Sequence, residues 1–91
     1  MAVNLPGARG RKKYVLLKVK ADIYSHKAHV HYYRGASERC LELLNRSYLV
    51  YQEINYLPGL GSCLNDIGLI YDKQGNVEKA LEYTLKGLRF S

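Results

Sequence analysis

Residues 64–83 read LNDIGLIYDKQGNVEKALEY, and this stretch decides the fold. Its first apolar residues recur at spacings of three and four, as they do on the buried face of a helix. Gly75-Asn76 then interrupts the pattern, with Asn76 placed to cap a second amphipathic helix. Gly68 in the first helix and Ala80 in the second are both small, so the two backbones can approach closely. The stretch therefore predicts a tight helical hairpin.

The same unit occurs once more, 40 residues earlier in the chain. The identical pairs gather in the turn and at the start of the second helix; they are Gly35/Gly75, Glu38/Glu78, Leu41/Leu81 and Glu42/Glu82. Similar residues also match at Val30/Ile70, Cys40/Ala80 and Arg46/Lys86. A repeat of this length is typical of a supersecondary unit that stacks on copies of itself. Stacked units build extended binding surfaces, so we expect a surface for a partner rather than an active site.

Four helices are expected, at about residues 12–33, 37–54, 58–73 and 76–90. Gly35 is placed to end the first helix in the left-handed conformation, and Ser37 is placed to cap the second. Pro58 belongs in the first turn of the third helix, where its missing N–H costs nothing. Gly87 is expected to fray the last helix, since glycine costs about 1 kcal/mol relative to alanine there. Short turns between such helices predict an all-α fold of two antiparallel helical hairpins, with an unrelated four-helix bundle as the alternative.

Residues 61–91 resemble a tetratricopeptide repeat. The signature of that family's first helix is a large apolar residue, then Leu-Gly, then Tyr, and here it reads Leu64, Ile67-Gly68, Tyr71. Ala80-Leu81-Glu82-Tyr83 is similar to the start of the family's second helix. The resemblance implies a short right-handed solenoid, in the longer variant of the family with a 40-residue period.

The first unit is a degenerate version of the second. Tyr24 and Ala28 stand at the large and the small position of the signature, but Lys27 and His31 replace Ile67 and Tyr71. The two repeat units are expected at about residues 17–54 and 57–91.

The resemblance also implies a non-catalytic module that binds a protein or peptide, because the first helices of successive family repeats line a concave groove. Mapped by register, the groove residues of the first unit are Asp22, Ser25, His26, His29, Tyr32 and Tyr33, and those of the second are Asn65, Asp66, Leu69, Asp72 and Lys73. The alternative is that these residues form only the polar side of the helices. The Lys and Asn with which some family members clamp a C-terminal carboxylate are replaced at Ser25, His29, Asn65 and Leu69, so we do not expect recognition of chaperone tails.

The last helix has an apolar stripe, made of Leu81, Leu85 and Leu88, that no following repeat covers. About three repeats are usually needed for a stable stack. We therefore expect either a longer array or a homo-oligomer formed through this edge. By analogy with the longer variant of the family, a regulatory or sensory segment of a larger bacterial signalling protein is the alternative function.

The net charge of +6 is concentrated before Asp22, because the eight basic and eight acidic residues from position 21 onward cancel. We expect residues 1–11 to form a flexible basic arm ahead of a helical domain at 12–91. Such an arm can bind nucleic acid or an anionic surface. A solvated tail is the simpler interpretation, so a nucleic-acid partner is not the preferred one.

The sequence predicts neither an enzyme nor a metal or cofactor site. His26 and His29 share a helix face, but His31 points away and only Asp22 lies one turn back. A histidine pair in the groove would instead make binding pH-sensitive. No apolar run approaches the roughly 18 residues of a membrane span. Two cysteines fit a reducing compartment, and we expect a cytoplasmic protein.

Overall fold

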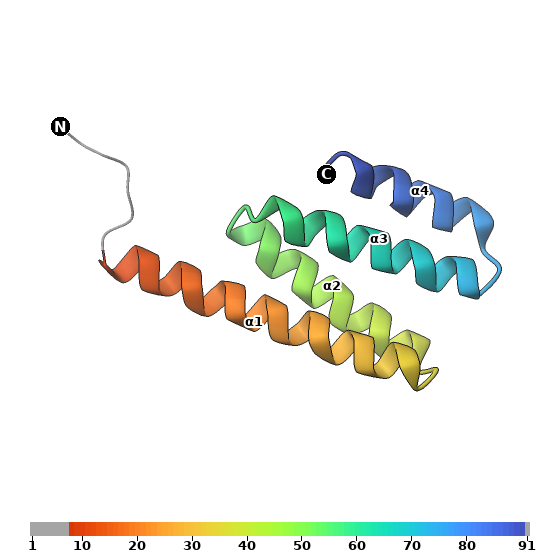
Figure 1. Cartoon of the computed structure of the whole chain (residues 1–91), viewed down its shortest axis with the longest axis horizontal. Helices are drawn as coiled ribbons and strands as arrows, with labels where there is room; N and C mark the ends of the chain where they lie inside the picture. The colour runs from red at the N-terminus through yellow and green to blue at the C-terminus, as the bar shows by residue number, and fades with distance from the viewer. Residues whose placement is uncertain (1–7, 91) are drawn as a thin grey trace.

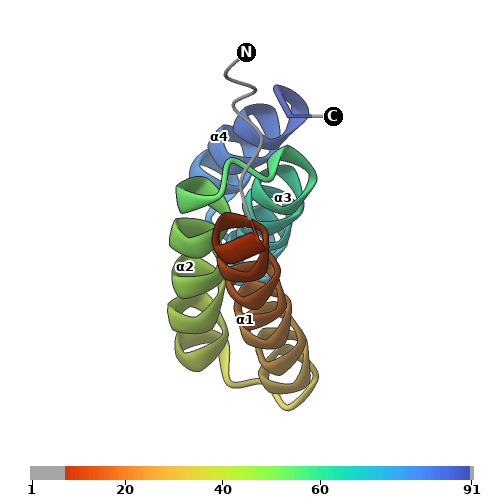
Figure 2. The ribbon, with the colours of Figure 1, turned by 90° about the vertical axis from the view of Figure 1, so that its left-hand side faces the viewer.

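The computed structural model describes residues 8–90, which form four helices. They are α1 (Ala8–Tyr33), α2 (Ser37–Glu53), α3 (Leu57–Lys73) and α4 (Val77–Leu88). Helix α1 packs on α2, α3 packs on α4, and α2 and α3 join the two hairpins. Figure 1 shows α1 and α4 at opposite sides of this array with α2 and α3 between them, and the end view in Figure 2 shows α2 to the left and α3 to the right of α1. The all-α fold of two stacked antiparallel hairpins is confirmed.

All three turns between helices close in the same way. The turn residue adopts a left-handed backbone at Gly35 (φ 77°), Asn55 (φ 56°) and Gly75 (φ 81°). In each turn the next N–H reaches back to a carbonyl five residues earlier at 2.9 Å: Ala36 to His31, Tyr56 to Tyr51 and Asn76 to Tyr71. This is the Schellman arrangement, in which glycine is favoured and asparagine is tolerated. The joint between the hairpins is therefore closed by Asn55, and Pro58 lies in the first turn of α3 as predicted.

Some helix ends differ from the sequence-based expectation. Helix α1 begins at Ala8, so residues 8–11 of the expected flexible arm are helical, while residues 1–7 lie outside the described part of the chain. Ser37 is the first residue of α2 rather than its cap, and the N-cap Ala36 offers no side-chain bond. Asn76 caps α4 as predicted, because its side-chain oxygen accepts the Lys79 N–H at 3.2 Å.

The core lies where α1, α2 and α3 meet, in two clusters of buried side chains. One cluster consists of Ala28, Cys40, Leu44, Ile67 and Ile70. The other consists of Ala21, Tyr51, Leu60 and Cys63. Both draw on the same three helices, so the hairpins are joined by a continuous core rather than by a surface contact.

Two glycines allow α3 and α4 to approach closely. A Cβ atom at Gly68 would lie 2.7 Å from Thr84 Oγ1 and 3.1 Å from the Ala80 carbonyl oxygen. A Cβ atom at Gly87 would lie 3.2 Å from the Gly61 carbonyl oxygen. Gly87 therefore has a packing role that the sequence-based expectation of fraying did not include. Gly87 is buried against α3, and its missing side chain makes room for that helix.

Gly68→Ala should destabilise the fold by about 1–3 kcal/mol, because the added methyl group meets Thr84 and the Ala80 carbonyl in a packed contact. The gain in helix propensity offsets only part of this cost. The measurement is urea unfolding followed by helical circular dichroism. Gly10→Ala, at an exposed position in α1, is the matched control and should leave stability unchanged or slightly higher. An equally stable Gly68→Ala variant would contradict the close approach.

Candidate binding face

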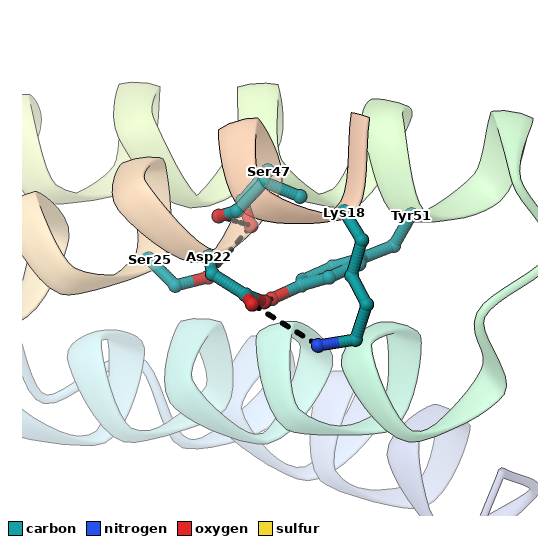
Figure 3. Close-up of polar contacts among 6 residues, drawn as sticks. Lys18, Asp22, Ser25, Ser47 and Tyr51 are labelled. Carbon is teal, nitrogen blue, oxygen red and sulfur yellow. Dashed lines mark hydrogen bonds and ion pairs between the residues drawn. The ribbon is translucent and has the colours of Figure 1, made fainter. Parts of the chain in front are cut away.

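A polar network ties two of the predicted groove residues, Asp22 and Ser25, to helix α2. Tyr51 donates its hydroxyl proton to Asp22 Oδ1 at 2.5 Å, and Lys18 Nζ donates to Asp22 Oδ2 at 3.1 Å. Figure 3 shows these groups converging from α1 and α2. Asp22 is therefore held by contacts within the first hairpin.

Ser25 takes part in the same network through the buried Ser47. Ser47 donates to the Ala21 carbonyl oxygen at 2.8 Å, which uses its single proton. Ser25 therefore donates the 2.6 Å hydrogen bond between Ser25 Oγ and Ser47 Oγ (Figure 3). Cys63 Sγ of α3 lies 4.0 Å from Ser25 Oγ, so the network reaches the second hairpin. Ser25 and Asp22 serve the packing of α1 on α2.

This environment shifts the pKa values of its titratable groups. Burial and the hydrogen bond to Asp22 raise the pKa of Tyr51 to about 12. Burial also acts to raise the pKa of Asp22, but the hydrogen bonds from Tyr51 and Lys18 outweigh it, and that pKa lies below its usual value. Burial raises the pKa of both free cysteines, Cys40 and Cys63, which keeps them as unreactive thiols.

Farther along α1, two contacts link its C-terminal turns to α3. His29 Nε2 lies 2.9 Å from Asp66 Oδ2, and both side chains keep some exposure to solvent. Lys73 Nζ lies 4.8 Å from the centre of the Tyr32 ring, a cation–π contact. The first helices of the two hairpins are therefore neighbours on one face, as their register predicts.

Between these contacts lies a hollow of about 130 Å³. We call it the α1–α3 hollow; its lining residues are His29, Tyr32, Tyr33, Cys40, Leu44, Asp66, Leu69 and Ile70. Cys40, Leu44 and Ile70 are buried and form an apolar floor, while Tyr33 and Leu69 are exposed at the rim. The hollow thus combines an apolar interior with a histidine and a carboxylate at its edge.

Five of the eleven predicted groove residues line this hollow: His29, Tyr32, Tyr33, Asp66 and Leu69. Asn65 lines a separate hollow beside Gly87 and Phe90. Asp72 lines another hollow, shared with α4, together with Leu69. His26 is exposed on α1, and Lys73 lies over Tyr32.

The floor of the α1–α3 hollow was missed by sequence reasoning. Cys40 and Leu44 come from the second helix of the first hairpin, and Ile70 is a buried residue of α3. Their apolar character gave a signal for the core but none for a surface hollow, because only the tertiary packing leaves an unfilled space above them.

Among the described residues, no group of three His, Cys, Asp or Glu side chains could hold a metal ion. Within the same part of the chain, no helix has the length and apolar character needed to cross a membrane.

Helical hairpins stacked so that their first helices share a face define a class of helical-repeat proteins. The model of the tetratricopeptide repeat family matches residues 20–90, and the chain belongs to this family. Comparisons with curated proteins and with solved structures found no match. The family is one of protein-interaction and scaffold modules that are generally non-catalytic.

Tyr51→Phe should lower the free energy of unfolding at neutral pH by about 1.5–3 kcal/mol, because it removes a hydrogen bond to a charged carboxylate. Urea unfolding followed by circular dichroism measures the change.

The difference in unfolding free energy between the wild type and Tyr51→Phe should depend on pH. A tyrosine has a pKa near 10 in the unfolded chain, whereas that of Tyr51 in the folded protein is about 12. The folded state therefore binds more protons between these values, and stability falls as the pH rises through this window. Tyr51→Phe lacks this loss, so the gap between the two proteins should narrow by about 2 kcal/mol from pH 10 to 12. A gap that stays constant would show that the Tyr51 hydroxyl is not held by Asp22.

Proposed function

We propose that this chain is a peptide-binding module and that the α1–α3 hollow receives one apolar side chain of its partner. The observation that carries the proposal is the hollow itself, with its volume of about 130 Å³ and its floor of Cys40, Leu44 and Ile70. An engineered apolar cavity of roughly 150 Å³ takes up benzene. The hollow thus has room for a single leucine-sized or aromatic side chain.

The rim of the hollow supplies the other features of a peptide site. Tyr33 is 86% exposed and can lay its ring against a bound chain while its hydroxyl forms a hydrogen bond. Asp66 presents a carboxylate that can accept bonds from backbone or side-chain N–H groups. An apolar anchor beside a few polar contacts is the usual arrangement of a side-chain pocket in peptide recognition.

The partner that fits is a peptide with an exposed Leu, Met or aromatic residue next to an N–H donor. A catalytic role has no support in this geometry, since both cysteines are buried with raised pKa values. The alternative of polyanion binding through the basic start of the chain remains a prediction. In its favour, Arg11, Lys12 and Lys13 are exposed on the first turns of α1. A cytoplasmic location likewise remains a prediction.

A random peptide library displayed on phage tests the proposal directly. Selected peptides should share one apolar anchor, and Leu69→Glu should weaken their binding about tenfold or more, because a carboxylate at the rim opposes burial of the anchor. Fluorescence polarisation with a labelled selected peptide gives the Kd.

Leu49→Glu is the matched control, because Leu49 is exposed to a similar degree on α2 and does not line the hollow. Leu69 is a better site for the test than Tyr32, which packs against the core and whose loss would also affect folding. Equal Kd values for the Leu69→Glu and Leu49→Glu variants, or selection of peptides without a shared anchor, would refute the proposal.

A further inference from the structure

Helix α1 carries a second apolar face, opposite the one that packs on α2. Its exposed residues fall within about 100° of the helix circumference at 100° per residue; they are Val15, Leu16, Val19, Ile23 and Val30. A helix that is apolar on two opposite sides is expected where it is covered from both. The described part of the chain covers only one of them.

The 40-residue repeat shows what kind of surface fits this outer face. Val19, Ile23 and Val30 correspond to Gly59, Cys63 and Ile70 of α3. Those three residues are buried, and they are the ones that meet α2. A Cβ atom at Gly59 would lie 2.5 Å from the Tyr51 ring, Cys63 clusters with Tyr51, and Ile70 clusters with Cys40 and Leu44. The outer face of α1 thus occupies the position with which α3 binds the preceding hairpin.

The opposite side of the array presents the matching half of that interface. Helix α4 exposes Val77, Leu81 and Leu88, which correspond to Ser37, Leu41 and Tyr48 of α2. In α2 all three are at least partly buried, and Leu41 and Tyr48 pack against the two core clusters. Figure 1 shows α1 and α4 on the two outer sides of the molecule.

A hollow between α3 and α4 supports the same correspondence. Its residues Leu69, Asp72, Ala80 and Thr84 each stand 40 positions after a residue of the α1–α3 hollow, namely His29, Tyr32, Cys40 and Leu44. In the α1–α3 hollow the remaining wall is Asp66, Leu69 and Ile70 of the next hairpin. The residues 40 positions before that wall are His26, His29 and Val30 on α1. An α1 helix placed against α3 and α4 would therefore supply the corresponding wall of the hollow between them.

We propose that a second copy of this chain stacks head to tail on the first. Helix α1 of the second copy lies against α4 and α3 of the first copy, in the same way that α3 lies against α2 and α1 within one chain. The interface within the chain is thereby repeated between chains. The interface borders the peptide site and shares Leu69 and His29 with it. The α1–α3 hollow is nevertheless formed within a single copy, so neither proposal requires the other. Because the two faces differ, the contact is heterologous and extends into open chains rather than closing as a symmetric dimer.

Charge and volume favour a second copy as the occupant. Lys27 of α1 stands where α3 has the core residue Ile67. Around Ile67 the walls are Ala28, Cys40 and Leu44, whereas the corresponding residues Gly68, Ala80 and Thr84 are smaller or polar and line a hollow of about 280 Å³. The longer lysine chain fits this wider space, and the carboxylate of Asp72 lies in the same hollow to meet its ammonium group.

Sedimentation velocity of the full chain from micromolar to near-millimolar concentration tests the proposal. The average mass should rise continuously with concentration. Ile23→Glu blocks the α1 face and Leu81→Glu blocks the α4 face; both sites are exposed, so the variants should fold, as circular dichroism would verify. Each variant alone should stay monomeric, but a mixture should form a heterodimer with one copy of each, because each retains the face that the other has lost.

The outcomes separate the alternatives. A monomeric wild type at near-millimolar concentration overturns the proposal and indicates that a further segment or another protein covers these faces. Self-association of Ile23→Glu alone indicates a symmetric contact through α4, and a mixture that stays monomeric also refutes head-to-tail stacking. Leu49→Glu should associate like the wild type. Lys27→Glu should weaken association, and Lys27→Glu combined with Asp72→Lys should restore it.

Discussion

The side chain of Tyr51 connects three of the four helices, and the arrangement of the rest depends on it. Its ring covers Gly59 of α3 so closely that a methyl group there would overlap the ring carbons. Its hydroxyl binds Asp22 of α1. A buried tyrosine contributes apolar packing through its ring and a directional hydrogen bond through its hydroxyl group. Tyr51 therefore contacts the helices on both sides of α2 and helps to hold the two hairpins together.

The α1–α3 hollow lies away from Tyr51, toward the other end of the same three-helix core. Near Tyr51 the three helices are packed tightly around Ser47 and Cys63, whose polar groups are satisfied within the network. Toward the other end, α1 and α3 are joined at the surface by His29 and Asp66, while the buried floor beneath lacks a side chain large enough to fill the space. A binding pocket results where the packing of two repeats is incomplete, which is typical of binding surfaces in stacked repeats.

The sequence predicted the architecture well because its signals are local. Gly35, Gly75 and Asn76 act within single turns, and the small residues Gly68 and Ala80 act within one hairpin. The site was predicted less well, because register alone assigned Asp22 and Ser25 to a groove. Their bonds to Tyr51 and Ser47 are formed by residues 22 or more positions away. Asn65 shares a helix with Asp66 but turns toward α4, since one residue along a helix rotates the side chain by about 100°.

The sequence by itself determined that the chain folds as two hairpins of the tetratricopeptide type, because helix periodicity, turn residues and small contact residues all act over a few positions. Only the tertiary structure decided which polar residues are used in packing and which remain at the surface, because hydrogen bonds between α1 and α2 compete with exposure to solvent. It also decided which apolar face of α1 is covered. One face packs on α2, whereas the other matches the buried face of α3 but lies exposed. That difference depends on which helix lies alongside, and helix neighbours are set by long-range packing.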